Sequence, residues 1–196
     1  MSPLHLNTPL LRAPPELFGE CTVWLKMDAL QPGGSFKMRG VGRLVQQRVA
    51  QGAKAVVCAS GGNAGMAATL AARACGVPAT IVVPRSTATA VREAIAARGA
   101  SLGARRVAPR ALAVAVAREH EIISLTVSDA QAVHACTRLA DTMRVLVEPA
   151  CGAALAALDA HPALFARFKA PLVEVCGGIG VSLTRLAAFR RDLGLD

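Results

Sequence analysis

A single lysine stands in the segment GGSFKMRG, residues 33–40, after two glycines, a serine and a phenylalanine. Lysine is rare in this chain, because only four of its 22 basic residues are lysines, at positions 26, 37, 54 and 169. A lysine amine can lose its proton in an apolar pocket and attack a carbonyl, whereas a guanidinium stays charged. Lys37 is therefore a candidate Schiff-base lysine. The alternative is a solvated side chain, which is the usual state of a lysine near a helix start.

A second candidate site is the segment SGGNAG, residues 60–65. It separates the strand-like run KAVVCAS from the helix-like run AGMAATLAARACG. Glycines let main-chain amides approach a ligand closely, and a helix N-terminus offers N–H groups that have no helical partner. Ser60 and Asn63 add side-chain donors. The pattern predicts a site for a carboxylate or phosphate, or else a glycine turn that only shortens the connection between strand and helix.

The elements that must position these residues follow from apolar runs and turn residues. Strands are expected at 21–27, 54–60, 78–84, 121–126 and 171–180, and helices at 38–51, 64–76, 86–99, 111–120, 128–143, 148–161 and 181–194. Strand, helix, strand and helix in residues 54–99 predict a βαβα unit whose two strands are parallel. Lys37 then lies at a helix N-terminus, and Ser128 caps a later helix.

Composition narrows the class of protein. Hydrophobic residues make up 53% of the 196, enough for a buried core. The formal charge of +9 suggests nucleic acid, but the arginines are scattered and aromatic residues make up only 3%. We therefore expect no nucleic-acid partner. No apolar run approaches the roughly 18 residues of a membrane span, so no membrane association is expected.

The cysteines and the N-terminal residues indicate the compartment. Six cysteines show no C-x-x-C spacing, and the four histidines are dispersed, so neither a zinc motif nor a disulfide framework is expected. The segment MSPLHLNTPLLR lacks the pattern of a secretion signal. The expected location is the cytoplasm.

Five ordered segments resemble the serine/threonine dehydratases of the pyridoxal-phosphate fold type II group, above all the serine dehydratase branch. The segments are TPLL, WLKMDALQPGGSFKMRG, AVVCASGGNAGMAATLAARACGVPATIVVP, LVEPACGAALAAL and VEVCGGIG. The resemblance implies an α/β fold, with a parallel sheet and flanking helices, that is a truncated version of the tryptophan synthase β-like fold. It further implies that residues 1–39 with 101–196 are the remnant of the larger cofactor-binding lobe, and that residues 40–100 are a βαβα remnant of the smaller lobe.

The resemblance assigns roles around the cofactor pyridoxal 5'-phosphate. Lys37 is the catalytic lysine that binds it covalently, Phe36 packs on the pyridine face, and Asn63 contacts the ring hydroxyl. Cys176, followed by Gly177, faces the pyridine nitrogen. A thiol there leaves that nitrogen largely unprotonated and so favours elimination over transamination. The alternative for Cys176 is an inert core thiol.

Other residues are assigned to the substrate and to an ion. The substrate-binding positions implied are Ser35, Ser60, Gly61, Asn63 and Ala64. Leu102 and Ala104 match a segment whose carbonyls help to bind a monovalent cation. Glu148 also matches the resemblance, but we interpret it as part of a structural turn.

The implied activity is an L-serine or L-threonine ammonia-lyase that forms a 2-oxo acid and ammonia by β-elimination. Relatives carry a glycine run that wraps the cofactor phosphate. In this chain ARGA is followed directly by SLGARR, whereas relatives have a large internal stretch between the matching segments, and that stretch includes the glycine run. A catalytically impaired or inactive relative that acts as an interaction protein is therefore the alternative. Lost strands also leave sheet edges open, so we expect that the remnant either repacks into a smaller sheet or pairs with another copy as a homodimer.

Overall fold

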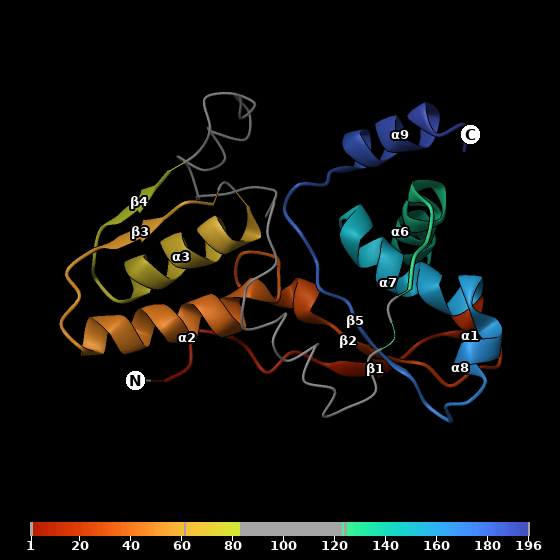
Figure 1. Ribbon diagram of the computed structural model, residues 1–196, viewed down its shortest axis with the longest axis horizontal. Helices are drawn as coiled ribbons and strands as arrows, with labels where there is room; N and C mark the ends of the chain where they lie inside the picture. The colour runs from red at the N-terminus through yellow and green to blue at the C-terminus, as the bar shows by residue number, and fades with distance from the viewer. Residues whose placement is uncertain (1, 61, 83–122, 124, 196) are drawn as a thin grey trace.

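The computed structural model describes residues 2–60, 62–82, 123 and 125–195 (Figure 1). The strands are β1 (Leu10–Arg12), β2 (Trp24–Lys26), β3 (Val56–Cys58), β4 (Ala79–Ile81) and β5 (Leu172–Glu174). The helices are α1 (Pro15–Phe18), α2 (Lys37–Ala50), α3 (Asn63–Ala74), α6 (Asp129–Met143), α7 (Pro149–Ala160), α8 (Pro162–Phe165) and α9 (Leu183–Asp192), with a 3-10 turn η1 at Asp28–Leu30. Among these residues, no helix combines the length and apolar content that a bilayer crossing requires.

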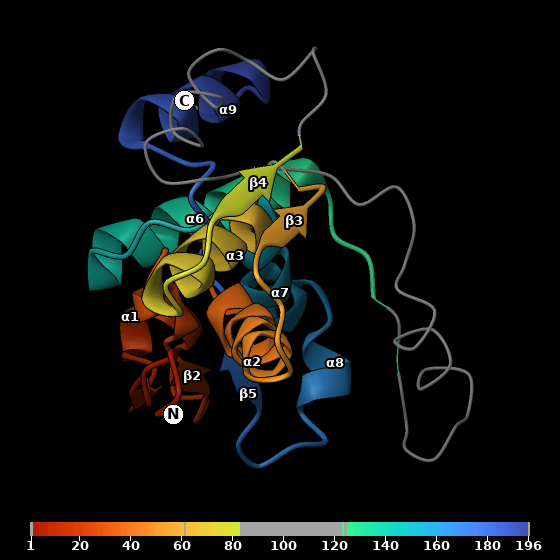
Figure 2. The ribbon, with the colours of Figure 1, turned by 90° about the vertical axis from the view of Figure 1, so that its left-hand side faces the viewer.

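Two small sheets organise the chain. Strands β3 and β4 pair in parallel and are connected through α3, as the βαβα pattern predicted. Strand β2 lies between β1 and β5, parallel to β5 and antiparallel to β1. Figure 1 shows the β3–β4 sheet with α3 and α2 at one end of the molecule and the β1–β2–β5 sheet with α6 to α9 at the other. Turning the molecule brings α2, α3, β3 and β4 to the front (Figure 2).

The predicted α/β architecture with parallel strand pairs and flanking helices is confirmed. The strand expected at 121–126 is absent from its described residues 123, 125 and 126, and the helices expected at 86–99 and 111–120 lie outside the described residues. Helix α2 runs without a break through residue 39, where the division between the two lobe remnants was drawn. That division stays a prediction.

A core of aliphatic side chains joins the three-stranded sheet to helices α6 and α7. Leu25, Leu139, Leu155, Val147 and Val175 are all at least 98% buried in this cluster. The start of α6 is fixed by a reciprocal cap, in which the Gln131 amide donates to the Ser128 hydroxyl and the Ser128 amide donates to the Gln131 side chain. The capping role predicted for Ser128 is confirmed.

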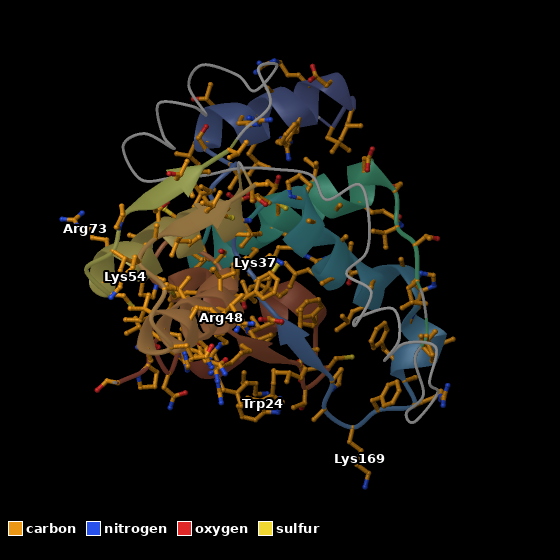
Figure 3. All side chains as sticks on the ribbon, turned by 60° about the vertical axis from the view of Figure 1, so that its left-hand side comes forward. Trp24, Lys37, Arg48, Lys54, Arg73 and Lys169 are labelled. Carbon is orange, nitrogen blue, oxygen red and sulfur yellow. The ribbon has the colours of Figure 1, made fainter. Side chains whose placement is uncertain are left out.

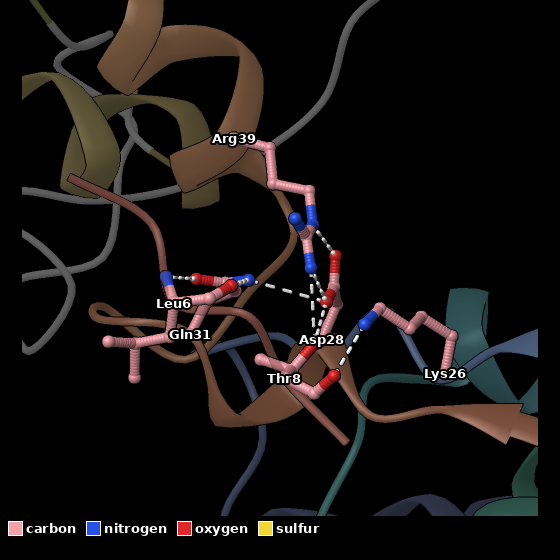
Figure 4. A network of polar contacts seen from close by, with 6 residues as sticks. All are labelled: Leu6, Thr8, Lys26, Asp28, Gln31 and Arg39. Atoms are coloured by element: carbon pink, nitrogen blue, oxygen red, sulfur yellow. Dashed lines mark hydrogen bonds and ion pairs between the residues drawn. The ribbon is translucent and has the colours of Figure 1, made fainter. Parts of the chain in front are cut away.

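A buried carboxylate ties the N-terminal segment to the start of α2 (Figure 4). Asp28 is 1% exposed and accepts hydrogen bonds from the Arg39 guanidinium at 2.5 and 2.8 Å, from the Thr8 hydroxyl and from the Gln31 amide. Burial alone raises the pKa of the Asp28 carboxyl, but the hydrogen bonds from Arg39, Thr8 and Gln31 outweigh it and hold the pKa well below its ordinary value. The charged carboxylate is therefore the form that this network stabilises.

The substitution Asp28→Asn should destabilise the fold by about 2 kcal/mol, less than for a fully buried pair because the Arg39 side chain is 32% exposed. Urea unfolding at neutral pH measures the change. Since the pKa of Asp28 is lowered in the fold, its contribution is complete above its ordinary pKa of 3.8 and is lost as the pH falls below that value. The loss of stability between pH 4 and 2 should therefore be smaller in Asp28→Asn than in the parent.

The matched control is Asp141→Asn, which changes an exposed carboxylate on α6. It should alter the free energy of unfolding by less than about 0.5 kcal/mol. Equal unfolding curves for the two variants would contradict the role assigned to Asp28.

Candidate active site

Two segments that are distant in sequence meet through their main chains. The Phe36 amide donates to the Cys176 carbonyl at 3.1 Å, and the Gly178 amide donates to the Gly34 carbonyl at 2.9 Å. Between these two bonds, Ser35 and Gly177 form an isolated antiparallel bridge. The segment before α2 and the segment after β5 are therefore held together residue by residue. This pairing brings the predicted Ser35, Phe36, Cys176 and Gly177 to one place.

The pairing requires glycine at two of its positions. Gly177 has a φ of +78°, and a Cβ there would stand 2.3 Å from the Gly34 carbonyl oxygen. Gly178 has a φ of +139°, and a Cβ there would stand 2.2 Å from the Glu148 carboxyl carbon. Both values lie where side chains are strained, and both contacts are closer than real Cβ atoms allow. These glycines serve close packing inside the protein.

Asn63 connects this pairing to the start of α3. Its side-chain oxygen accepts from the Ile179 amide at 3.1 Å, and its side-chain nitrogen donates to the Glu148 carboxylate at 3.2 Å. An asparagine amide has two donor hydrogens and two acceptor lone pairs, so one donor and one acceptor of Asn63 have no partner among the described residues. The protein thus fixes the orientation of Asn63 and leaves half of its hydrogen-bonding capacity.

Glu148 has a larger role than the sequence interpretation gave it. It does stand in the turn before Pro149, where α7 begins. Its carboxylate also accepts from Asn63 and, at 2.6 Å, from the Gly180 amide. One side chain therefore joins α3, α7 and the 177–180 loop. A glutamate placed after an apolar run and before a helix-starting proline was the available signal, but the sequence does not show which loop it meets.

Lys37 is the first residue of α2, as predicted. Its amine lies 4.1 Å from the centre of the Phe36 ring, which is a cation–π contact. In Figure 3 Lys37 lies toward the middle of the molecule, whereas Lys54, Arg73 and Lys169 lie near its outline. The amine is also close enough to Glu174 to lower that carboxyl's pKa, although partial burial and the neighbouring Asp28 raise it overall.

The hollows beside Lys37 do not extend to the glycine turn. One of about 380 Å³ is lined by Lys37 with Phe36, Arg39, Gly40, Val41 and Leu44. Another of about 340 Å³ is lined by Phe36, Ala154, Leu158, Phe165, Leu172, Val173, Glu174 and Cys176. Phe36 borders both, and no residue from 60–65 lines either. Neither of these two hollows joins Lys37 to Asn63 among the described residues, and the segments that carry the two residues are connected through the 176–180 segment.

Cys176 has another thiol as its neighbour. A hydrogen bond with Cys151, together with burial, raises the pKa of the Cys176 thiol. Burial also raises the pKa of nearby Cys136 to about 11, and its thiol donates to the Glu148 carbonyl at 3.5 Å. Cys176 is therefore a neutral thiol at physiological pH. A neutral group is the kind that the resemblance implies beside an unprotonated pyridine nitrogen.

The remaining predicted residues divide into two groups. Ser60 precedes α3, where its hydroxyl accepts from the Gly62 amide at 3.2 Å, and Ala64 lies in the first turn of α3. Gly61, Leu102 and Ala104 lie outside the described residues. Within the described ranges, no cluster of histidine, cysteine, aspartate or glutamate has the arrangement of a metal site.

Comparison with protein families gives a match over residues 1–104 to the family described as pyridoxal-phosphate dependent enzyme. A mouse protein named L-serine dehydratase/L-threonine deaminase is 54% identical over 86 residues, which are 43% of this chain and 26% of that protein. The matched segment thus spans about a quarter of the mouse protein.

Longer matches show the shortening of this chain. The human protein of the same name is 29% identical over 318 aligned positions that cover 98% of this chain and 97% of the human one. Since this chain has 196 residues, more than a third of those positions have no counterpart in it. The crystal structure of a fungal L-serine ammonia-lyase from Rhizomucor miehei superposes with a TM-score of 0.76, at 22% identity, over 96% of this chain and 98% of that one. This last likeness shows a shared fold.

Glu148→Gln tests the carboxylate that joins α3 to the 177–180 loop. An amide can accept from only one of the two donors, so the other, on Asn63 or Gly180, loses its acceptor. Hydrogen exchange of the Ile179 and Gly180 amides should become about 10-fold faster, the effect of losing about 1.4 kcal/mol from a charge-assisted bond. Amides in α6 should be unaffected.

Glu16→Gln, an exposed change on α1, is the matched control and should leave all of these exchange rates unchanged. Unchanged exchange at Ile179 and Gly180 in Glu148→Gln would show that the loop is held by its glycine pairing alone.

Proposed function

Because this chain belongs to the family of pyridoxal-phosphate dependent enzymes, we propose that it is a lyase that removes ammonia from L-serine or L-threonine. The product would be a 2-oxo acid formed by β-elimination. The observation that carries the proposal is the convergence of the α2 N-terminus, the 176–180 segment and Asn63. Relatives named L-serine dehydratase/L-threonine deaminase support the substrate class.

The residues present fit the ring end of pyridoxal phosphate. The Lys37 amine contacts the Phe36 ring. It makes no hydrogen bond to another described residue, so no such bond has to break before the amine reacts. Asn63 is held in place, and the part of the chain that the structure describes uses only one of its two donors and one of its two acceptor positions. Cys176 offers a neutral thiol beside Phe36, with which it lines one hollow. Lys37, Phe36, Asn63, Cys176 and Gly177 would hold the ring.

When bound, the cofactor supplies an electron sink for the carbanion left after loss of the substrate's α-proton. The chain's own residues supply the proton transfer and the orientation. Lys37 would hold the cofactor through its Nζ atom and, once the amine of the substrate has displaced it, the released Nζ would take the α-proton as a base. Glu148 keeps Asn63 in its orientation, so Glu148 is a positioning residue.

The substrate carboxylate would bind at the start of α3. The first N–H groups of a helix point outward without helical acceptors and carry partial positive charge. Ser60, Asn63 and Ala64 stand at this end of α3, and Gly61 and Ser35 belong to the same proposed substrate site. We assign the proposed monovalent cation to the segment with Leu102 and Ala104.

The second candidate function is that of a relative that binds the cofactor without turnover. It is favoured by the alignment, in which more than a third of the positions of the human relative have no counterpart here. The resemblance places the phosphate-binding glycines in that interval. Such a chain would keep the covalent chemistry of Lys37 and lose the release of a 2-oxo acid.

We propose the cytoplasm as the location, supported by six cysteines that are all free thiols.

We further propose a homodimer that pairs through β5, whose outer edge has no neighbouring strand among the described residues. Pro171 and Val175 direct their main-chain groups toward β2, so Leu172 and Glu174 direct theirs to the open edge. Leu172 is 63% exposed there.

Lys37→Ala and Lys37→Arg test the proposed function. Both should abolish the formation of pyruvate from serine or of 2-oxobutyrate from threonine, since neither side chain gives a neutral amine at neutral pH. Lys54→Arg, an exposed lysine outside the site, should keep at least about half of the parent activity. Borohydride reduction with added pyridoxal phosphate, followed by peptide mapping, should label Lys37 in the parent.

The two assays separate the candidate functions. Labelling of Lys37 without release of a 2-oxo acid would establish the cofactor-binding, non-catalytic relative. Labelling of other lysines to the same extent, with no 2-oxo acid, would contradict both.

Sedimentation equilibrium tests the proposed dimer. Leu172→Glu places a charge on the open strand edge and should weaken self-association at least about 10-fold. Leu193→Glu alters another exposed leucine, just after α9, and should leave the association constant unchanged. A monomeric parent at micromolar concentration would overturn the proposal.

A further inference from the structure

A third hollow, which Lys37 does not line, lies between α1, α8 and the segments that flank β2 and β5. Its volume is about 770 Å³, within the range of small-molecule sites. Most of its walls are apolar, and they include Leu17, Phe18, Val23, Leu158, Phe165 and Phe168. No residue to which the proposed lyase chemistry gives a role lines this hollow, and the small polar substrates of that chemistry do not match its walls.

Charged side chains also border this apolar cavity. Two cations, Arg138 and Lys169, and one anion, Asp159, line it. The Arg138 guanidinium donates to the Asp159 carboxylate at 2.8 Å and lies 5.5 Å from the centre of the Phe18 ring. Asp159 therefore balances one of the two positive charges, and the lining keeps a net charge of +1.

Arg138 has donor capacity that the protein does not use. A guanidinium carries five N–H donors in a planar fork. The Arg138 Nε is buried and has no hydrogen-bond partner among the described residues. This atom has almost no accessible surface, but the Arg138 side chain as a whole is 28% exposed, so its terminal N–H groups are the donors that a ligand in the cavity can reach. A carboxylate suits both these donors and the net charge.

We propose that this cavity binds a monocarboxylate with an apolar body, such as a medium-chain fatty acid, with its carboxylate on Arg138 and its chain among the phenylalanines. The apolar walls supply the hydrophobic part of the affinity, because an alkyl chain that enters the cavity leaves water. The charges supply selectivity for an anion over a neutral or cationic molecule of the same length.

An occupant of this cavity also touches part of the wall of the candidate active site. Leu158 and Phe165 line both the 770 Å³ cavity and the 340 Å³ hollow that contains Phe36 and Cys176. A chain bound against these two side chains limits their movement toward Cys176. The fatty acid therefore binds next to the cofactor pocket, with two side chains between them.

Isothermal titration calorimetry of octanoate into the full chain tests the proposal. We expect one site per chain, and octan-1-ol, which has the same body without the charge, should bind at least 10-fold more weakly. Arg138→Met keeps the length of the side chain and removes its charge, so it should weaken octanoate at least 10-fold and leave octan-1-ol unchanged. Asp159→Asn removes the competing anion and should strengthen octanoate several-fold.

The matched control is Arg185→Met. Arg185 also lies 5.5 Å from a phenylalanine ring, that of Phe189, but it is not among the residues that line the cavity. The variant Arg185→Met should bind octanoate with an affinity within about twofold of that of the parent. The proposal is overturned if octanoate does not bind, if octan-1-ol binds as tightly, or if Arg138→Met and Arg185→Met behave alike.

The variant Asp159→Asn keeps the test valid if Arg138→Met fails to fold, since Asp159 is 46% exposed. Octanoate affinity that does not rise in Asp159→Asn would then contradict the charge assignment. None of these measurements depends on turnover, so a chain that releases no 2-oxo acid can still bind octanoate.

Discussion

The position of the candidate active site depends on the buried carboxylate of Asp28. A charge at this depth is stable only because Arg39, Thr8 and Gln31 donate to it. Thr8 belongs to the N-terminal segment, Gln31 follows η1, and Arg39 lies in the first turn of α2. One side chain thus fixes three segments at once. Lys37 precedes Arg39 by two residues, so the network that holds Arg39 also fixes the position from which the Lys37 amine extends.

The contact between α2 and the C-terminal segment uses main-chain groups and close glycine packing. Ser35, Phe36 and Gly34 pair with residues 176–178, and Asn63 and Glu148 bind the next two amides along. These hydrogen bonds fix the start of α2 relative to the segment after β5 without a hydrophobic interface between the two. The contact also tolerates few substitutions. A Cβ at Gly177 would meet the Gly34 backbone, and a Cβ at Gly178 would meet the hydrogen-bonded carboxylate of Glu148.

Much of this arrangement could be predicted from the sequence where the signal is local. Apolar periodicity located α2, α3, α6, α7 and α9, and the glycine turns indicated where strands end. The helices α1 and α8 were missed because four residues carry too little periodicity to detect. The strand β1 was missed because it does not stand within a run of strand-forming residues as β2 to β5 do. The roles of Asp28 and Glu148 were missed for another reason. Apart from Gln31, which is three residues from Asp28, their partners lie 11 to 85 residues away, and no local pattern encodes such pairs.

The location of these contacts in the sequence explains which parts of the candidate active site a shortened chain can keep. The contacts that fix Lys37, Asn63 and Cys176 arise within residues 6–63 and 148–180, on both sides of the interval that lacks a counterpart in this chain. Removing residues between these two ranges therefore need not displace the amine or the asparagine. The group that holds a phosphate is different, since the resemblance places it inside the lost interval. In the proposed function, covalent capture by Lys37 and tight retention of the cofactor would thus depend on separate parts of the fold, and losing the second leaves the geometry around Lys37 in place.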